Sequence, residues 1–559
     1  MAMSRLTGVV SVVILAAALC PVPAFADDTK VAAVQPSEET LRQGETMYRK
    51  GLLPSGQPMQ ALVRGDVTVD GTAFTCVSCH LRSGIGSIEG GVITPPTNGA
   101  TLYRPLPTKY KGIEVPSAPP VRPAYTDESL ANLLRTGVSP TGRRIRDVMP
   151  RYLINEQDTA ALIAYLKTLS PALSPGYSDN TLRFATIVTD GVDKADEDAM
   201  LSVLDGFITS KNNLVKTYKE RPKSARMAES MTLSKDAVYV KLALSHWRLK
   251  GSPDTWRAQL EDYNKKEPVF GLVGGITNGE WRPIHEFCEQ NRIPCLLPIT
   301  DFPVVSDSDW YTLYFSKGYY QEGEATARYM SAMEDEGRVL QLVRDSREGL
   351  ALSEGFTKTW AEQFRKPAVT VKLAPDEKLT ADSLRKMIEK ERPSVLVVWD
   401  GPSAIPAVEG LAGMKGRPGA VMVSSVYMGK ALYNLSDGAR EFTYISYPYR
   451  TPDDEARLYK NFSDPFMKFA GTGPDEHRVA GRAVAIDRVL SQAVMDLRGN
   501  YYRDNLMDVI GMAQDQQFPV YERLSFGPSQ RYASKGCYII QLTKGDKPSI
   551  IKKSDWVSH

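Results

Sequence analysis

Histidine and cysteine are scarce in this sequence, which has 5 histidines and 6 cysteines among 559 residues. One C-x-x-C pair occurs, at positions 76–79, and no H-x-x-x-H run accompanies it. A zinc site needs four closely spaced ligands, so this composition does not favour one. Opposite charges nearly cancel, with 68 basic and 66 acidic residues mixed along the chain. A nucleic-acid-binding surface is therefore not expected.

Long apolar runs are also missing after the amino-terminal segment, so no later membrane span is predicted. No Ser/His/Asp ordering, pair of catalytic carboxylates or phosphate-binding loop stands out, and turnover by this chain alone is not expected. The glycine-rich residues 84–91 follow the cysteine pair rather than a strand, which argues against a dinucleotide-binding motif. His246, His285 and His477 lie on predicted helices without nearby metal ligands, and we interpret them as surface or packing residues.

Residues 1–26 have the pattern of a secretory signal peptide. Arg5 supplies a positive charge, residues 9–19 are apolar but too short to span a bilayer, and residues 24–26 form a small-residue cleavage site. Cys20 raises the alternative of a lipoprotein anchor, but the leucine before it is bulkier than such a site prefers. We therefore expect a periplasmic protein with no transmembrane segment after signal cleavage.

The segment Cys76-Val-Ser-Cys79-His80 is the attachment signature of a c-type haem. Its cysteines share one side of a helical turn, where both thiols can meet the vinyl groups of a porphyrin, and His80 follows as an iron ligand. A zinc site, a thioredoxin-like dithiol and coincidence are the alternatives. The dithiol lacks a strand-to-helix context, because the loop-like residues 65–72 precede the motif. One motif predicts one covalent haem c.

A methionine downstream of this motif would complete the coordination of the iron. Met149 is the best candidate because it lies beside Pro150, in a loop before a helix that has Asn155 as its N-cap. Met47 and Met59 are rivals upstream of the motif, and a methionine that merely fills the core is the alternative. With both axial positions filled, the iron would pass single electrons.

Residues 37–170 resemble a class I cytochrome c. The segments that carry the resemblance are a first helix at 39–51 with Gly44 and Tyr48, the motif at 76–80, the glycine-rich loop at 84–91, a helix at 127–135, Met149-Pro150 and a final helix with Tyr165. The resemblance implies an all-α domain in which His80 and Met149 bind the haem iron.

Two details of this predicted domain concern its packing. Gly44 is small enough to let the first helix cross the final one closely. A proline-rich insertion, residues 92–122, leaves open whether the carbonyl of Pro95 or that of Pro96 orients His80.

After a linker at residues 171–182, the pattern changes to alternating strands and helices. Strands are predicted at 182–188, 269–273, 339–343, 369–373, 395–399 and 421–424, and helices at 195–208, 254–263, 281–290, 352–364 and 381–391. Apolar strands that alternate with helices indicate parallel sheets covered on both faces. Residues 183–559 are therefore predicted to form a doubly wound α/β unit with two lobes.

This second unit resembles the type I periplasmic binding proteins, the group that includes Leu/Ile/Val receptors of ABC transporters. Residues 268–275 are similar to a strand with a glycine turn, residues 292–298 to a proline that precedes an apolar strand, and residues 318–330 to the helix that enters the second lobe. The resemblance implies a two-lobed fold and a small organic ligand.

Ligands of such folds lie between the lobes, at the carboxyl ends of the strands. The candidate ligand-binding residues at these positions are Asp190, Gly274, Gly275, Thr277, Asn278, Asp301, Asp400 and Ser403. A simpler interpretation is that the acidic residues cap turns and that the others belong to ordinary loops. The aromatic residues Trp310, Tyr311, Tyr314, Phe315, Tyr319 and Tyr320 could line a pocket, but packing between the lobes is the favoured interpretation.

Three cysteines remain after the signal peptide and the haem motif. Cys288 closes a predicted helix and Cys295 opens an apolar strand, and an oxidising compartment allows a disulfide between them. Two buried free thiols are the alternative. Cys537 is expected to be an inert strand residue.

These observations lead to the hypothesis of a periplasmic protein with one haem that transfers single electrons. Its second unit would bind a small organic molecule or dock a redox partner, such as a periplasmic dehydrogenase or another cytochrome. The first alternative is a solute receptor for ABC-type uptake or sensing, in which the haem modulates binding. The second is an accessory subunit whose haem serves a separate catalytic chain.

Overall fold

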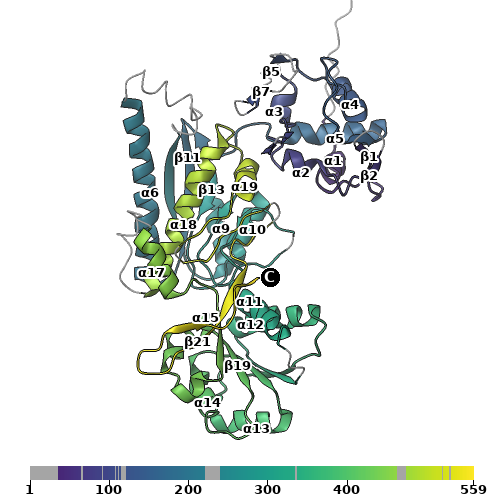
Figure 1. The fold of residues 1–559 in the computed structure, drawn as a ribbon. Helices are drawn as coiled ribbons and strands as arrows, with labels where there is room; N and C mark the ends of the chain where they lie inside the picture. Colours follow the sequence, from purple (N-terminus) through teal and green to yellow (C-terminus); the bar gives the residue numbers. More distant parts are fainter. Residues whose placement is uncertain are drawn as a thin grey trace, which may run out of the picture.

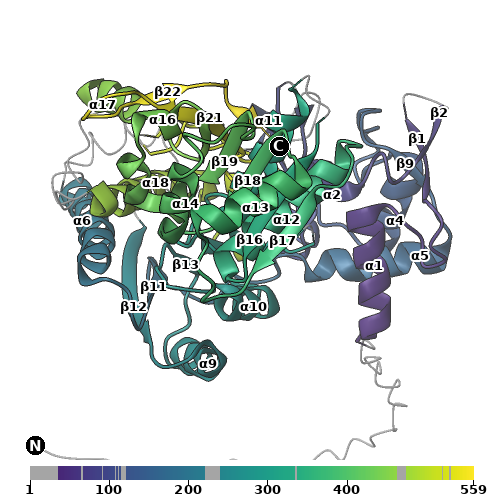
Figure 2. The ribbon, with the colours of Figure 1, turned by 90° about the horizontal axis from the view of Figure 1, so that it is seen from below.

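The computed structural model describes residues 35–558, apart from 64–66, 91, 108, 111–112, 115–120, 221–239, 307, 334–336, 462–473, 519 and 528–529. The predicted signal peptide and Cys20 lie outside the described residues. Figure 1 shows an amino-terminal unit beside two α/β lobes that are stacked one above the other. Seen from below, in Figure 2, the amino-terminal unit stands to one side of both lobes.

Helices α1 (Glu38–Lys50) and α5 (Glu156–Thr168) form the centre of the amino-terminal unit. They cross at Gly44, where an added Cβ would lie 2.3 Å from the carbonyl oxygen of Ala161 and 2.6 Å from Cβ of Tyr165. No larger residue fits there, so the predicted close crossing is confirmed. The predicted N-cap of the second helix is also confirmed, because the Asn155 side chain accepts a hydrogen bond from the backbone N–H of Asp158 at 2.8 Å.

The prediction of an all-α amino-terminal unit is wrong, because strands β1 (Gln60–Val63), β2 (Val67–Asp70) and β9 (Arg151–Leu153) form an antiparallel sheet in the order β2-β1-β9. The stretch expected to be a loop before the cysteine pair contains β2. Ala61 and Tyr152 pair across this sheet and are both buried, so the sheet covers one side of the helical core.

Shorter elements complete this unit. They are α2 (Cys76–His80), β3 (Ile88–Glu89), β4 (Val92–Ile93), α3 (Gly99–Leu102), β5 (Leu106–Pro107), β6 (Lys109–Tyr110), β7 (Ile113–Glu114), β8 (Val121–Arg122) and α4 (Asp127–Thr136). The helix predicted at 127–135 is therefore confirmed as α4.

Lobe 1 is built on a parallel sheet in the order β12-β11-β13-β14-β15, with β10 antiparallel to the start of β11. These strands are β10 (Tyr177–Ser178), β11 (Thr181–Thr189), β12 (Lys241–Leu249), β13 (Gly271–Val273), β14 (Cys295–Leu296) and β15 (Thr312–Leu313). The helices of this lobe are α6 (Lys194–Glu220), η1 (Pro253–Thr255), α9 (Trp256–Lys266), α10 (Arg282–Asn291), α17 (Pro452–Asn461), α18 (Pro474–Leu497) and α19 (Arg503–Gly511). His246 lies on β12, so its assignment to a helix is wrong.

Lobe 2 repeats the same order at its centre, with parallel strands β17-β16-β18-β19-β20. Its strands are β16 (Val339–Arg344), β17 (Val369–Leu373), β18 (Val395–Trp399), β19 (Ala420–Ser424), β20 (Thr443–Tyr447), β21 (Gly536–Leu542), β22 (Ile550–Lys552) and β23 (Val557–Ser558). Strand β21 runs antiparallel to β20, β22 and β23, so the expectation of purely parallel sheets is wrong at this edge.

The helices of lobe 2 are α11 (Tyr319–Ser331), α12 (Arg347–Glu362), α13 (Ala381–Glu391), η2 (Pro402–Ala404), α14 (Ile405–Glu409), α15 (Ser425–Met428), η3 (Gly429–Asn434) and α16 (Asp437–Arg440). Helix α11 contains most of the segment expected to enter the second lobe, and α13 matches its predicted bounds.

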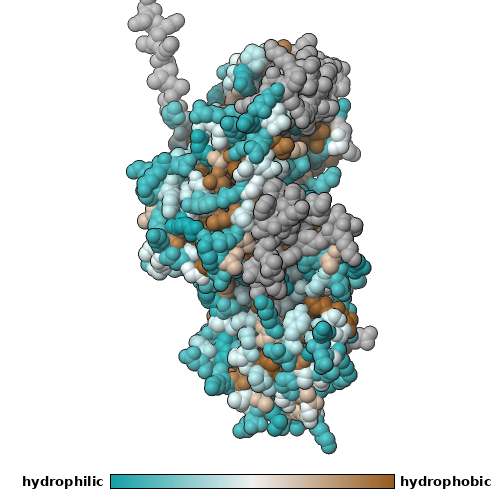
Figure 3. Space-filling view, turned by 90° about the vertical axis from the view of Figure 1, so that its left-hand side faces the viewer, coloured by the Kyte–Doolittle hydropathy of each residue, from teal (hydrophilic) through white to brown (hydrophobic). Residues whose placement is uncertain are grey.

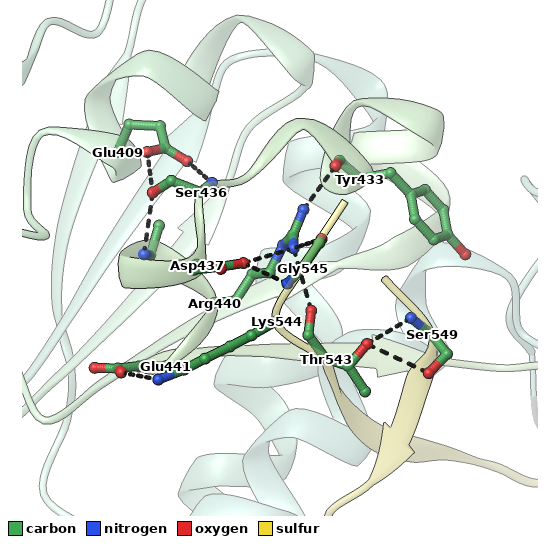
Figure 4. Close-up of polar contacts among 11 residues, drawn as sticks. Glu409, Tyr433, Ser436, Asp437, Arg440, Glu441, Thr543, Lys544, Gly545 and Ser549 are labelled. Carbon is green, nitrogen blue, oxygen red and sulfur yellow. Dashed lines mark hydrogen bonds and ion pairs between the residues drawn. The ribbon is translucent and has the colours of Figure 1, made fainter. Parts of the chain in front are cut away.

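Arg440 anchors the hairpin between β21 and β22 to this lobe (Figure 4). Its guanidinium donates hydrogen bonds to the carbonyl oxygens of Tyr433, Thr543 and Gly545, and it forms an ion pair with Asp437 at 2.9 Å. Because these acceptors come from separate segments, one buried side chain holds the antiparallel edge in place.

The segment expected to be a linker is attached to lobe 1. The backbone N–H of Ser174 donates to the carbonyl of Tyr501, and the ring of Tyr177 lies 4.3 Å from that of Tyr501. Strand β10 then pairs with β11, so the second unit begins before residue 183. The local composition of residues 171–182 predicted a spacer between the units. In the structure, contacts with lobe 1 make this segment part of that lobe.

The face of the molecule drawn in Figure 3 is mainly polar. Figure 3 shows hydrophilic residues over most of the visible face, with separate apolar patches on the upper and lower parts. In the described part of the chain, no helix combines the length and the hydropathy that crossing a bilayer requires.

Candidate functional site

The predicted haem motif forms a helical turn, α2. Cys76 is half-buried, Cys79 is exposed, and both are free thiols. His80 is 8% exposed, and its Nδ1 lies 2.9 Å from the carbonyl oxygen of Pro95. A carbonyl only accepts, so Nδ1 carries the hydrogen and Nε2 is left with a free electron pair. Of the two carbonyls left open by the sequence, the structure selects that of Pro95.

The electrostatics of His80 suit a metal-binding imidazole. Burial lowers the pKa of His80 to about 4, and the hydrogen bond to Pro95 only partly opposes this effect. The ring is therefore neutral at physiological pH, which is the form that binds a metal.

Met149 is half-buried and packs against the apolar cluster that also contacts Cys76 and Val77. Its rivals Met47 and Met59 are fully buried members of that cluster. The donor set of two free thiols, a neutral imidazole and an available thioether therefore fits the residues that a haem c requires.

At the carboxyl edge of the lobe 1 sheet, several predicted ligand residues come together. Thr189 Oγ1 donates to Thr277 Oγ1 at 3.1 Å, and Asn278 Nδ2 donates to the carbonyl of Gly191 at 3.0 Å. Gly275 has φ +94, and a Cβ there would lie 2.7 Å from the Trp281 ring. These contacts fix the loops after β11 and β13 against each other.

Asp190 lies at the same edge but has a turn-capping contact. Its Oδ2 accepts a hydrogen bond from the backbone N–H of Gly251 at 2.9 Å, which joins the ends of β11 and β12. This contact is the one that the simpler interpretation of Asp190 expects.

A cluster around Arg482 was not anticipated from the sequence. Gly274 at the end of β13 packs against α18, since an added Cβ would lie 3.2 Å from Cδ1 of Ile486. Arg482 is one turn before Ile486, is almost fully buried, and donates to Tyr449 Oη at 2.7 Å. Asp301 Oδ1 lies 3.6 Å from the same guanidinium. Arg482 is thus placed beyond the strand ends, beside a predicted ligand residue.

Arg478 adds a second positive charge to this cluster. Its guanidinium lies 4.5 Å from the centre of the Tyr449 ring, and that of Arg482 lies 5.6 Å from it. Among the described residues, Nε of Arg482 has no hydrogen-bond partner. Sequence reasoning missed the pair, although two arginines one turn apart, separated only by Val479, Ala480 and Gly481, are a detectable signal.

Side chains of lobe 2 approach the same region. The Arg347 guanidinium lies 4.9 Å from the centre of the Phe302 ring of lobe 1. The Tyr319 ring lies 5.1 Å from Phe302 and 6.1 Å from Tyr427, and Tyr427 Oη lies 2.7 Å from Ser346 Oγ. Aromatic and cationic side chains of both lobes therefore meet beside Asp301.

The lobe 2 candidates have different surroundings. Asp400 is 2% exposed, and Arg344 donates to both of its carboxylate oxygens, at 2.9 Å from Nε and 2.6 Å from Nη2. Oδ1 also accepts from the backbone N–H of Gly401. The carboxylate of Asp400 is thus occupied within its own lobe. Ser403 is exposed on η2.

The remaining predicted residues are mainly in the core. Cys288 on α10 and Cys295 in β14 are fully buried and in contact, as free thiols; their disulfide stays a prediction. Cys537 is buried in β21, as expected. The aromatic residues Tyr311, Tyr314, Phe315 and Tyr320 are buried. Tyr314 packs among residues of lobe 1, and packing between the lobes stays a prediction for the group.

Comparison with protein families gives one match, to the periplasmic binding protein model, over residues 249–546. This match covers more than half of the chain. The chain belongs to the periplasmic binding protein family. A search of curated protein sequences with this chain finds no match.

Several solved structures are similar to this chain. A branched-chain amino acid ABC transporter protein from Rhodospirillum rubrum is similar with a TM-score of 0.50 and 14% identity, over 66% of this chain and 100% of its own. A substrate-binding protein from Sphaerobacter thermophilus has a TM-score of 0.48 and 13% identity, over 68% and 98% of the two chains. A Thermus thermophilus transporter protein with bound valine has a TM-score of 0.46 and 12% identity, over 68% and 97%.

Family membership makes this periplasmic binding protein an extracytoplasmic, two-lobed α/β protein of a non-enzymatic class. The matched residues lie entirely within the second unit. The predicted haem motif and the amino-terminal unit fall outside the family match.

Proposed function

We propose that this periplasmic binding protein captures a small organic anion, a carboxylate, between its lobes, and that its amino-terminal unit carries one covalent haem c. The ligand assignment depends mainly on the buried guanidinium of Arg482 and its unpartnered Nε. Solute capture is thus the primary function, and the haem is an addition to it.

The charge of the cluster supports an anionic ligand. A buried cation is costly unless an anion compensates it. Arg478 and Arg482 share the Tyr449 ring, while Asp301 lies at 3.6 Å with a side chain that is 41% exposed. Within the described part of the chain, Asp301 is the carboxylate paired with this cluster, and one solvated carboxylate compensates two neighbouring cations only in part. A ligand carboxylate would match the planar fork of an arginine and complete the balance.

The apolar side chains around the cluster suggest the rest of the ligand. Phe302 belongs to lobe 1, while Tyr319 and Tyr427 belong to lobe 2, and their rings lie within 6.1 Å of a neighbour in this group. Rings from both lobes could enclose a flat or branched apolar group when the lobes close. An aromatic or branched aliphatic acid is the ligand class we infer.

Calorimetric titration with a panel of carboxylic acids and their matched amides tests this proposal. We expect the acids to bind and the amides to bind poorly. Replacing Arg482→Gln should lower the affinity by about 100-fold, since it removes a charge-assisted contact. Arg488→Gln is the matched control, because Arg488 is exposed on the same helix. Equal affinity in both variants, or no acid that binds the unmodified protein, contradicts the proposal.

In the amino-terminal unit, Cys76 and Cys79 would hold the porphyrin through thioether bonds, while His80 and Met149 would bind the iron. The neutral, oriented imidazole of His80 is the observation that supports this assignment. When bound, the haem would supply a one-electron couple. Exposure of Cys79 leaves one side of the motif open to solvent. Electron exchange with a dehydrogenase or another cytochrome is therefore the second candidate function.

Absorption spectra of protein matured with a haem-attachment apparatus test the haem. We expect a Soret band that survives denaturation and acid extraction, and that is lost in the Cys76→Ser/Cys79→Ser variant. Met149→Ala should change the spectrum of the low-spin iron and lower the reduction potential. Met59→Leu, a substitution within the core, should leave both unchanged. Absence of the Soret band in the unmodified protein overturns the assignment.

A further inference from the structure

The loop that follows His80 has a defined shape within the amino-terminal unit. Leu81 ends α2 with φ +65, and its carbonyl accepts a hydrogen bond from Tyr48 Oη at 2.7 Å. The backbone N–H of Gly86 donates a hydrogen bond to the carbonyl of His80 at 3.1 Å. The orientation of His80 therefore depends on how residues 81–86 are held.

Lobe 1 holds this loop through Asp508 on α19. The backbone N–H of Arg82 donates to Oδ1 of Asp508 at 3.2 Å, and that of Ser83 donates to Oδ2 at 2.8 Å. Asp508 is buried, so water does not compete for these contacts. A carboxylate that accepts two successive peptide N–H groups fixes the direction of both peptides.

The side chain of Arg82 strengthens the same attachment. Its guanidinium lies 4.0 Å from the centre of the Trp310 ring, and the guanidinium of Arg531 lies 4.2 Å from it. The backbone N–H of Trp310 donates to Glu289, and Arg531 donates to the carbonyl of Trp310 at 2.8 Å. The partner surface for the loop is thus itself fixed within lobe 1.

Ser170 joins the loop from the other side. Its Oγ donates to the carbonyl of Ser83 at 2.8 Å, and its own carbonyl accepts from Asn98 Nδ2 at 3.2 Å. The peptides at positions 82 and 83 are therefore held by both units. Two units that merely dock would contact each other through surface side chains. Here, Asp508 and Ser170 bind backbone groups next to the predicted iron ligand.

The charge of Asp508 also lies close to the predicted haem site. Burial is the main cause that raises the pKa of Tyr48, and the nearby Cys76 and Asp508 add to it. Tyr48 therefore lies close enough to both Cys76 and Asp508 to be affected by their charges. Other charged groups of this interface are Arg49, Arg82, Glu289, Asp504 and Arg531. A buried negative charge near a haem favours the oxidised iron.

We propose that Asp508 is a positioning residue for His80: through the backbone of residues 82 and 83 it holds the loop of the iron ligand, and its charge lowers the reduction potential. The binding-protein unit would then contribute a group that tunes the haem of the other unit. This inference rests on the proposed haem.

The test compares Asp508→Asn with Asp508→Glu in the full-length, haem-loaded protein. The asparagine keeps the shape, removes the charge and turns a donor toward one of the two N–H groups. The glutamate keeps the charge at a different length. Asp496→Asn is the matched control, because Asp496 is half-exposed on α18 and accepts from Gln492. The readouts are amide hydrogen exchange in residues 81–86 and the reduction potential from spectroelectrochemistry.

In Asp508→Asn we expect at least about tenfold faster exchange in residues 81–86 and a higher potential, with neither change in the control. Asp508→Glu should return the potential toward that of the unmodified protein while exchange stays fast. An unchanged potential in Asp508→Asn overturns the proposal, because Asp508 is then only a docking contact. Unchanged exchange overturns it as well. If the unmodified protein holds no haem, the haem assignment fails first, and exchange still shows whether the loop is clamped.

Discussion

The two lobes have the same central strand order but neutralise charge differently at the carboxyl ends of their strands. In lobe 2, the carboxylate of Asp400 is buried and paired with Arg344 through two hydrogen bonds. In lobe 1, Arg482 is buried beside Asp301, which lies 3.6 Å away and is partly exposed. A buried ion pair is already compensated for charge, whereas a partly compensated cation gains more from an added anion. We therefore expect the lobe 1 edge to be the side that selects the ligand.

The largest effect that tests this comparison concerns the stability of lobe 2. Asp400→Ala leaves the Arg344 guanidinium buried without its counter-ion, so the free energy of unfolding should fall by about 3–5 kcal/mol. Urea unfolding followed by circular dichroism measures it. Asp382→Ala is the control, because its partner Arg385 is exposed, and it should cost less than about 1 kcal/mol. Equal costs in the two variants would show that Asp400 is not a structural counter-ion.

A second effect comes from Glu322, a buried carboxylate of lobe 2 that accepts hydrogen bonds from Ser424 and Ser446. Burial raises the pKa of Glu322 from 4.5 to about 7, although these hydrogen bonds oppose the shift. Between these pH values the folded protein holds a proton that the unfolded chain has lost. The free energy of unfolding should therefore fall as pH rises from 4.5 to 7, by about 3 kcal/mol from this group.

Glu322→Gln should remove this contribution, and the difference between the unmodified protein and the variant isolates it from other titrating groups. Urea unfolding at pH 4.5, 6 and 8 gives the comparison. Glu354→Gln, an exposed substitution on α12, is the control. A difference that does not change with pH would mean that Glu322 titrates as an ordinary carboxyl in the folded state.

A smaller effect is expected from the carboxylate of lobe 1. Asp301→Asn removes the charge that partly compensates Arg482, so an anionic ligand should bind about fivefold more tightly, or about 1 kcal/mol. The gain is modest because the Asp301 side chain is 41% exposed and screened by water. Calorimetric titration with the acid identified for the unmodified protein measures it. A loss of affinity would show that Asp301 contacts the ligand directly.

The smallest effect distinguishes a turn cap from a ligand contact. Asp190→Ala removes the acceptor for the N–H of Gly251 and should lower the free energy of unfolding by about 0.5–1 kcal/mol. Ligand affinity should stay within twofold of that of the unmodified protein. A larger drop in affinity at equal stability would place Asp190 in the binding site and extend the ligand contacts of lobe 1.

Local patterns in the sequence predicted much of the fold. The strands at 369–373 and 395–399 and the helix at 381–391 have the bounds that their apolar patterns predict. Strand β12 was missed, although its buried residues Trp247 and Leu249 are two positions apart, as a strand requires. The antiparallel edge was missed because β21 reaches its partners only after the chain has passed through lobe 1 and returned.

The two candidate sites also differ in how far local sequence predicts them. The five consecutive residues of the haem motif indicate their chemistry without any tertiary information. The Arg482 cluster joins α18, the segment after β20 and the loop after β14, so local sequence carries only the arginine pair as a signal. Asp400, which position alone nominated for the ligand, is paired with the buried guanidinium of Arg344, and its role in ligand binding stays a prediction.

The sequence by itself determined the order of the units and the alternation of strands and helices, and it predicts an export signal and a haem site, because each depends on neighbours along the chain. Tertiary structure alone decided which carboxylates are neutralised, which arginine is left partly compensated, and that Asp508 holds the loop after His80. Burial and ion pairing depend on segments that meet only after folding, and these determine the free energy of a charge.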